Sequence, residues 1–163
     1  MKQFIEKHQA RPPAKEPDNA DQLRLLTEED GVVKLGNDGA TESLVQATCR
    51  PGTREGRCLW VILAADVPSI IEIAPRVRAP LQSGVAKHTN LTGGGPAGCG
   101  GECWVDPTVE NRLWVTGGSG RYPPRSPQHL EDAVALLRRL GYDVKCAGWS
   151  TDNDCAERVF REA

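Results

Sequence analysis

The residues best suited to chemistry lie in two glycine-rich segments, 87–104 and 117–126. Glycine lets backbone N–H groups approach a ligand, and successive N–H groups form concave sites for anions. Polar side chains that could contact a phosphate, sugar or carboxylate accompany these glycines. We therefore expect one pocket for a small phosphate-bearing, nucleotide-like ligand. The candidate ligand-binding residues are Thr89, Asn90, Gly93, Gly94, Ser119, Gly120, Arg121 and Arg125.

Three further side chains could catalyse a reaction on such a ligand: His88, Glu102 and Tyr122. The imidazole of His88 has an ordinary pKa near neutrality, which suits general acid–base catalysis or a contact to a ribose. Glu102 could orient a hydroxyl or act as a base, and Tyr122 could stack on a ring. Structural roles stay open for all three, because neither segment fits the dinucleotide fingerprint or the P-loop spacing.

The order of short motifs in 88–124 resembles a pattern found in bacterial polymorphic-toxin and effector domains. It is also similar to the C-terminal part of plant calmodulin-binding IQ-motif proteins. The motifs here are His-Thr-Asn-Leu, then Gly-Gly-Glu, then Ser-Gly-Arg-Tyr-Pro-Pro. Thr89 and Asn90 replace a serine pair of those families, and Arg121 replaces their second histidine. The resemblance implies a shared site and names no reaction.

A second resemblance concerns the spacing of His88, Tyr122 and Glu157, which is similar to ADP-ribosyltransferases of the His-Tyr-Glu type. In those enzymes the histidine holds the nicotinamide ribose, the tyrosine stacks on nicotinamide, and the glutamate stabilises the oxocarbenium ion. This resemblance implies ADP-ribosyl transfer with NAD as a candidate cofactor. The alternative is a non-catalytic protein-binding module, such as an immunity or anti-defence protein, with the same loops as its interface. Whether the chain is an enzyme is therefore left open.

The cysteines offer a rival chemistry. Among the six thiols only Cys99 and Cys103 have a spacing typical of metal ligands, and they lack a second pair, so we expect no metal site. A disulfide between Cys146 and Cys155 would close a polar hairpin if the protein is exported.

Composition and charge exclude several classes of partner. A net charge of −2 argues against a general nucleic-acid binder, which needs a clustered basic surface. No apolar run approaches the roughly 20 residues that cross a bilayer, so we expect no membrane partner. The first eight residues lack the apolar core of a secretory signal, which favours a cytoplasmic location.

These residues must be positioned by helices and strands, and the sequence patterns predict an α+β fold with a mixed or antiparallel sheet. One helix is well defined at about 127–140, with Ser126 as N-cap, Pro127 at the first position and Gly141 after its end. We expect residues 1–20 to form a flexible N-terminal arm and 21–163 a single domain. Strands are expected at 32–35, 42–49, 58–65, 101–105, 112–116 and 142–146, a strand or helical turn at 69–74, and short helices at 21–30 and 154–161.

Overall fold

A computed structural model describes residues 1–161 and has the expected α+β architecture. Six strands form one mixed sheet in the order β1-β3-β2-β4-β5-β6, in which only the β5–β6 pair is parallel. Two further strands, β7 and β8, form a separate small sheet. The strands are β1 Val33–Lys34, β2 Cys58–Val61, β3 Pro68–Ile71, β4 Gly100–Val105, β5 Arg112–Thr116, β6 Asp143–Cys146, β7 Trp149–Ser150 and β8 Cys155–Ala156.

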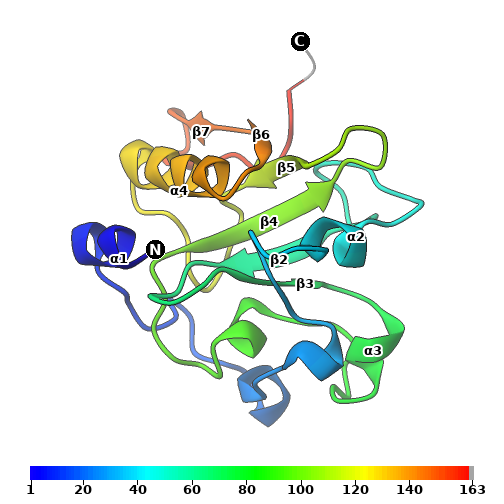
Figure 1. Ribbon diagram of the computed structural model, residues 1–163. Coiled ribbons are helices and arrows are strands. Elements are labelled where there is room, and N and C mark those ends of the chain that lie inside the picture. Colours follow the sequence, from blue (N-terminus) through cyan, green and yellow to red (C-terminus); the bar gives the residue numbers. More distant parts are fainter. Residues whose placement is uncertain (162–163) are drawn as a thin grey trace.

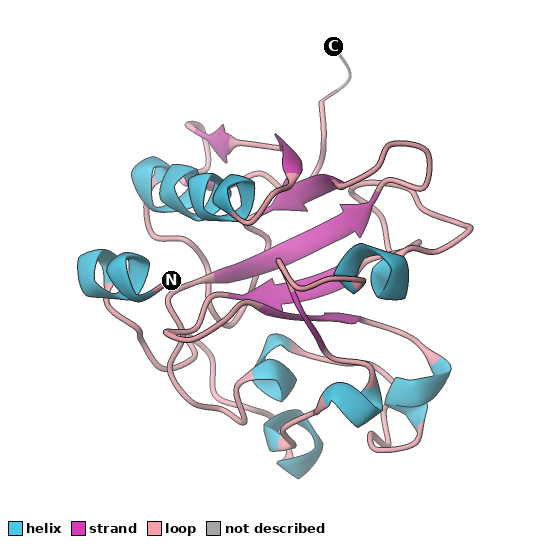
Figure 2. Cartoon of the chain, viewed as in Figure 1, coloured by secondary structure: helices cyan, strands magenta, loops and turns pink. Residues whose placement is uncertain are grey.

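Helices cover both faces of the large sheet. Figure 1 shows α4 and α1 on one side and α3 with several short helical turns on the other, and Figure 2 gives the same view by secondary structure. The two sides have separate apolar cores, one of which includes Trp60 and the other Val61. No helix in residues 1–161 is long and apolar enough to span a membrane. The helices are α1 Lys2–His8, α2 Ala40–Leu44, α3 Pro75–Arg78 and α4 Pro127–Arg139, and the 3₁₀ turns are η1 Ala20–Leu23, η2 Glu28–Asp30 and η3 His88–Leu91.

Helix α4 confirms the strongest prediction from the sequence. The Ser126 hydroxyl accepts a hydrogen bond from the backbone N–H of His129 at 3.1 Å, and Pro127 occupies the first turn. Leu130, Val134 and Leu137 are buried against the sheet, as their helical spacing requires. The chain then turns through Gly141, whose φ of 103° only glycine adopts readily, and enters β6.

Strands β4 and β5 form the predicted antiparallel hairpin, with Trp104 opposite Trp114. Residues directly opposite in neighbouring antiparallel strands share a face of the sheet. Leu59 of β2, Glu102 of β4 and Thr116 of β5 therefore lie side by side on the face away from α4. This register places the candidate carboxylate next to the ends of both glycine-rich segments.

Three expected elements are wrong. Residues 42–49 do not return as a strand: Ala40 and Leu44, one helical turn apart, are buried in α2, and β1 pairs with β3 instead. The expected helix at 21–30 is divided into the short turns η1 and η2. The helical turn expected at 154–161 is also absent, because β8 pairs with β7 there.

Residues 1–20 lie along the domain. Phe4 of α1 is buried, and its ring packs 5.4 Å from that of His129, measured between centroids. Further along, Arg11 and Ala97 exchange backbone hydrogen bonds of 2.9 and 3.0 Å, and the N–H of Ala14 donates to the Arg121 carbonyl at 2.7 Å. This segment therefore contributes residues to the surface around Arg121.

Candidate functional site

Both glycine-rich segments reach one cavity of about 270 Å³ at the end of the sheet face that carries Glu102. We call it the His88 cavity. Four predicted residues line it: His88 from the first segment, Glu102 from β4, and Gly120 and Arg121 from the second segment. The convergence on which the expected pocket depends is therefore present for these four residues.

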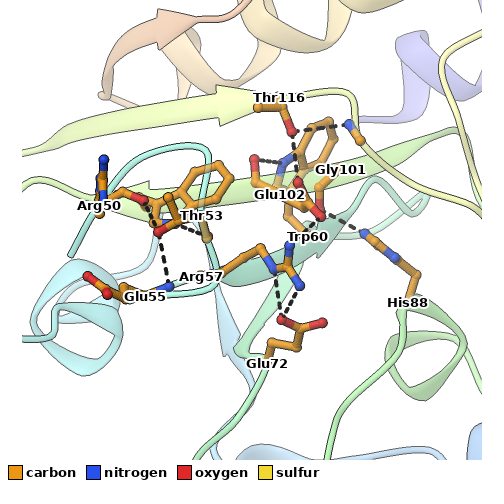
Figure 3. A network of polar contacts seen from close by, with 12 residues as sticks. Arg50, Thr53, Glu55, Arg57, Trp60, Glu72, His88, Gly101, Glu102 and Thr116 are labelled. Atoms are coloured by element: carbon orange, nitrogen blue, oxygen red, sulfur yellow. Dashed lines mark hydrogen bonds and ion pairs between the residues drawn. The ribbon is translucent and has the colours of Figure 1, made fainter. Parts of the chain in front are cut away.

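His88 begins the η3 turn and points toward β4, as Figure 3 shows. Its Nε2 lies 2.8 Å from the carbonyl oxygen of Gly101. Because a carbonyl can only accept, Nε2 carries the proton and Nδ1 is left as an acceptor. Burial lowers the pKa of His88 to about 4, and the nearby cations Lys87 and Arg158 act in the same direction. The imidazole is therefore neutral at neutral pH.

The carboxyl group of Glu102 is held between an arginine and a hydroxyl. Its Oε1 lies 3.3 Å from Nη1 of Arg57, and its Oε2 accepts from the Thr116 hydroxyl at 3.4 Å. Burial raises the pKa of Glu102, and Arg57 and Arg158 offset that effect only in part. Glu102 therefore keeps its proton to a higher pH than an exposed glutamate does.

Arg57 also binds a second carboxylate at the same cavity (Figure 3). Its Nε and Nη2 donate to Oε2 of Glu72 at 2.7 and 2.6 Å. Glu72 and Glu102 are thus joined through one guanidinium, and both are buried. This cluster could not be predicted from the sequence, because Arg57 and Glu72 flank two different strands and belong to no recognisable motif.

Arg121 is only 7% exposed and contacts the N-terminal segment. Its Nη1 donates to the carbonyl oxygens of Lys15 and Glu16 at 2.6 and 2.5 Å, and its Nη2 donates to Oε1 of Gln22 at 2.5 Å. Asp18 lies 3.7 Å away from Nη2. The guanidinium is therefore bonded to oxygen atoms from residues 15–22, which form one wall of the cavity.

Two cations of the cavity wall have no such partner. Within residues 1–161, neither Lys87 nor Arg158 forms a salt bridge, although both line the His88 cavity. Lys87 precedes His88 directly, so its place beside the imidazole could have been found from the sequence. Arg158 could not, because it comes from the segment after β8, which was expected to be helical.

Several other candidate residues maintain the loops. The Asn90 side chain donates to the carbonyls of Asp21 and Arg24, both at 2.9 Å, and accepts from the N–H of Lys87 at 2.7 Å. The Ser119 hydroxyl accepts from the N–H groups of the two residues that follow Gly120. Thr89 is fully buried. Gly93 and Gly94 have positive φ angles and face Leu25 and Leu23.

Tyr122 and Arg125 do not line the His88 cavity. The Tyr122 hydroxyl donates to the carbonyl of Gly95 at 2.7 Å and contacts the Thr92 hydroxyl at 2.8 Å, and its ring borders a different cavity. Arg125 donates to the carbonyls of His8 and Gln9. Glu157, the third residue of the ADP-ribosyltransferase spacing, does not line the His88 cavity either.

All six cysteines are free, so Cys146 and Cys155 do not form the disulfide considered above. Cys99 is buried, and burial raises the pKa of its thiol strongly. Cys58 and Cys103 lie opposite each other on β2 and β4, on the face toward α4. Within residues 1–161, no three His, Cys, Asp or Glu side chains are grouped as a metal ion would require.

Comparisons with protein families, curated proteins and solved structures find no match to the chain. The residues of the His88 cavity are therefore the basis for assigning a function.

Proposed function

We propose that the chain binds a small phosphate-bearing, nucleotide-like ligand in the His88 cavity and acts on it by acid–base chemistry. The observation that carries this proposal is the combination of groups at one cavity. A carboxyl with a raised pKa and a neutral imidazole lie beside two cations that form no salt bridge within residues 1–161. Perturbed titratable groups in a concave site are a recognised mark of function.

Lys87 and Arg158 supply the attraction for a phosphate. Both line the cavity and lie close enough to the imidazole of His88 to lower its pKa. A phosphate that bound between them would offset their charge and make charge-assisted hydrogen bonds. Gly118 and Gly120 border the same space. A volume of about 270 Å³ is just below the range for drug-sized ligands, so it suits the sugar-phosphate end of a nucleotide.

Glu102 and His88 have complementary roles in this proposal. The raised pKa of Glu102 suits it to give a proton to a leaving group. Nδ1 of His88 has no hydrogen-bond partner within residues 1–161, which suits the imidazole to accept a proton from an attacking water or hydroxyl. The reaction class is the transfer of a sugar or phosphate group to water or a hydroxyl, with ADP-ribosyl transfer as one member. Tyr122 has no role in this proposal, because it does not line the His88 cavity.

Binding is tested by thermal unfolding with NAD, ADP-ribose and cyclic AMP. A ligand present at 100 times its Kd should add about 2.7 kcal/mol to the free energy of unfolding. Lys87→Gln should weaken the effect, and Lys34→Gln, which changes a lysine paired with Asp66 on another part of the surface, should not. No stabilisation by any of the three ligands would contradict the proposal and favour the protein-binding alternative.

Catalysis is tested by incubating the protein with each ligand that binds and separating the products by chromatography. Glu102→Gln and His88→Gln should keep binding and slow turnover by about 100-fold or more, as expected for general acid–base groups. Turnover at the normal rate in both variants would show that the chemistry lies elsewhere.

A further inference from the structure

A second cavity, of about 420 Å³, also borders Arg121. We call it the arginine cavity. Its charged groups are Arg11 from the N-terminal segment and Arg121 and Arg125 from the second glycine-rich segment, and none of its lining residues is acidic. Arg121 is already bonded to oxygen atoms of residues 15–22 and lies 3.7 Å from Asp18, so Arg11 and Arg125 are the two guanidinium groups of this space that lack a carboxylate partner within residues 1–161.

The charges of this cavity repel one another. Burial lowers the pKa of Arg125, and the neighbouring charge of Arg11 lowers it further. In the part of the chain that the structure describes, neither Arg11 nor Arg125 belongs to a salt bridge. Nη2 of Arg125 donates to the carbonyls of His8 and Gln9, and the Arg11 side chain makes no hydrogen bond within residues 1–161. An anion between the two guanidiniums would relieve the repulsion and accept the free N–H donors.

The remaining wall of the cavity is apolar and rigid. Pro12, Pro13 and Pro123 contribute rings with fixed backbone angles, and the buried Tyr122 lies behind them. The backbone bridge between Arg11 and Ala97 holds this part of the N-terminal segment in place. The cavity is therefore formed before any ligand binds, and its volume lies within the range typical of small-molecule sites.

We propose that the arginine cavity is a second binding site, which takes a small anion composed of a phosphate or diphosphate joined to a flat apolar body, such as a nucleoside diphosphate. The phosphate lies between Arg11 and Arg125, and the flat body packs on the proline rings. The two cavities share only Arg121 among their lining residues, so this site does not depend on chemistry at His88.

The test is isothermal titration of the full chain with ADP, inorganic pyrophosphate and adenosine. ADP should bind more tightly than either of the other two, because only ADP offers both the phosphates and the flat body. Arg11→Gln should weaken ADP binding about tenfold or more, since it removes a charge-assisted contact. Arg54→Gln, which changes an exposed arginine outside the cavity, is the matched control and should leave binding unchanged.

Arg125→Gln should give a similar loss, but Arg125 also holds backbone carbonyls of the N-terminal segment. Arg11→Gln is therefore the decisive variant, with circular dichroism to establish that it folds. No ADP binding, or equal binding by the wild type and Arg11→Gln, would overturn the proposal. Loss of ADP binding in Lys87→Gln but not in Arg11→Gln would place the nucleotide in the His88 cavity alone. That outcome would overturn this site and leave the proposed function standing.

Discussion

The His88 cavity and the arginine cavity share Arg121 but differ in the charged groups that line them. In the first, Arg57 pairs with both Glu72 and Glu102, and burial keeps His88 neutral. In the second, Arg11 and Arg125 have no carboxylate partner within residues 1–161, and the lining holds no acidic residue. Balanced, buried groups with shifted pKa values are suited to moving protons. The His88 cavity combines such groups with Lys87 and Arg158, which form no salt bridge within residues 1–161. The arginine cavity offers cations and no acidic group, so the two neighbouring cavities differ in chemistry.

Because of this difference, substitutions at the two kinds of group should change different free energies, that of unfolding and that of ligand binding. Removing one partner of a buried ion pair leaves an uncompensated charge, which is costly. Removing a guanidinium that has no ionic partner leaves no such charge. Substitutions in the buried ion pairs of the His88 cavity should therefore affect stability, and substitutions of cations without an ionic partner within residues 1–161, in either cavity, should affect ligand binding.

The largest effect is expected for Arg57→Met. This change leaves the carboxylates of Glu72 and Glu102 buried without their cation, and it should lower the free energy of unfolding by about 4 kcal/mol. Urea denaturation at pH 7 measures the loss. Arg112→Met is the control, because Arg112 pairs with the more exposed Asp143 and should cost about 1 kcal/mol or less. Similar losses in the two variants would remove the contrast between buried and exposed pairs.

A smaller loss, about 3 kcal/mol, is expected for Gly101→Ala. A Cβ at this position would lie 2.0 Å from the Thr116 carbonyl oxygen, so β4 and β5 would have to separate. The same shift would move the Gly101 carbonyl that accepts from His88. At Gly120, where a Cβ meets nothing within 4 Å and φ is not positive, alanine should change stability little. Chemical denaturation of both variants decides the point, and equal stability would contradict the packing described for β4.

Acid should destabilise the protein through His88. The pKa of His88 is about 4 in the folded protein, below the ordinary 6.5, so the unfolded chain binds the proton more readily. Stability present above pH 6.5 is therefore lost as the pH falls toward 4, and the part due to His88 reaches about 2 kcal/mol at pH 5. His129, with its pKa also lowered to about 4, adds a loss of the same sign.

The variant His88→Gln isolates the contribution of His88 from that of His129. Between pH 7 and pH 5 the wild type should lose about 2 kcal/mol more than this variant, measured by urea denaturation at both pH values. An equal loss in both would mean that His88 is not held neutral by burial.

The smallest effect on stability is expected at the arginine cavity. Arg11→Gln should change the free energy of unfolding by no more than about 0.5 kcal/mol, because the exposed side chain has no ionic partner within residues 1–161. Thermal denaturation without ligand provides the measurement. A loss of several kcal/mol would show that Arg11 is structural and would weaken the contrast between the two cavities.

Local sequence signals predicted the elements whose stability is mostly local. Ser126, Pro127 and the spaced leucines identify α4 because capping and amphipathic periodicity act within one helix. The hairpin of β4 and β5 was also predicted, from two short strand patterns separated by a loop. The segment 42–49 was not, because whether Leu44 closes a helical turn or joins a strand depends on distant packing partners.

The same distinction applies to the sites. Glycine-rich composition and polar side chains led to His88, Glu102 and Arg121, which lie at one cavity. The spacing of His88 and Tyr122 did not predict a shared location, because the turn after Gly120 directs the tyrosine toward Thr92 and Gly95. Arg57, Glu72 and Arg158 reach the cavity only through tertiary folding, and no motif marks them.

The central claim is that His88 presents a neutral imidazole with a free Nδ1 to a bound phosphate-bearing ligand. Nuclear magnetic resonance of the histidine ring nitrogens, in protein labelled with ¹⁵N at its three histidines, tests it directly. At pH 7 His88 should be the neutral tautomer protonated at Nε2, and saturating ADP-ribose should shift its Nδ1 resonance while His129 stays unchanged. A charged His88 at pH 7, or an Nδ1 resonance that does not move on saturation, would contradict the account.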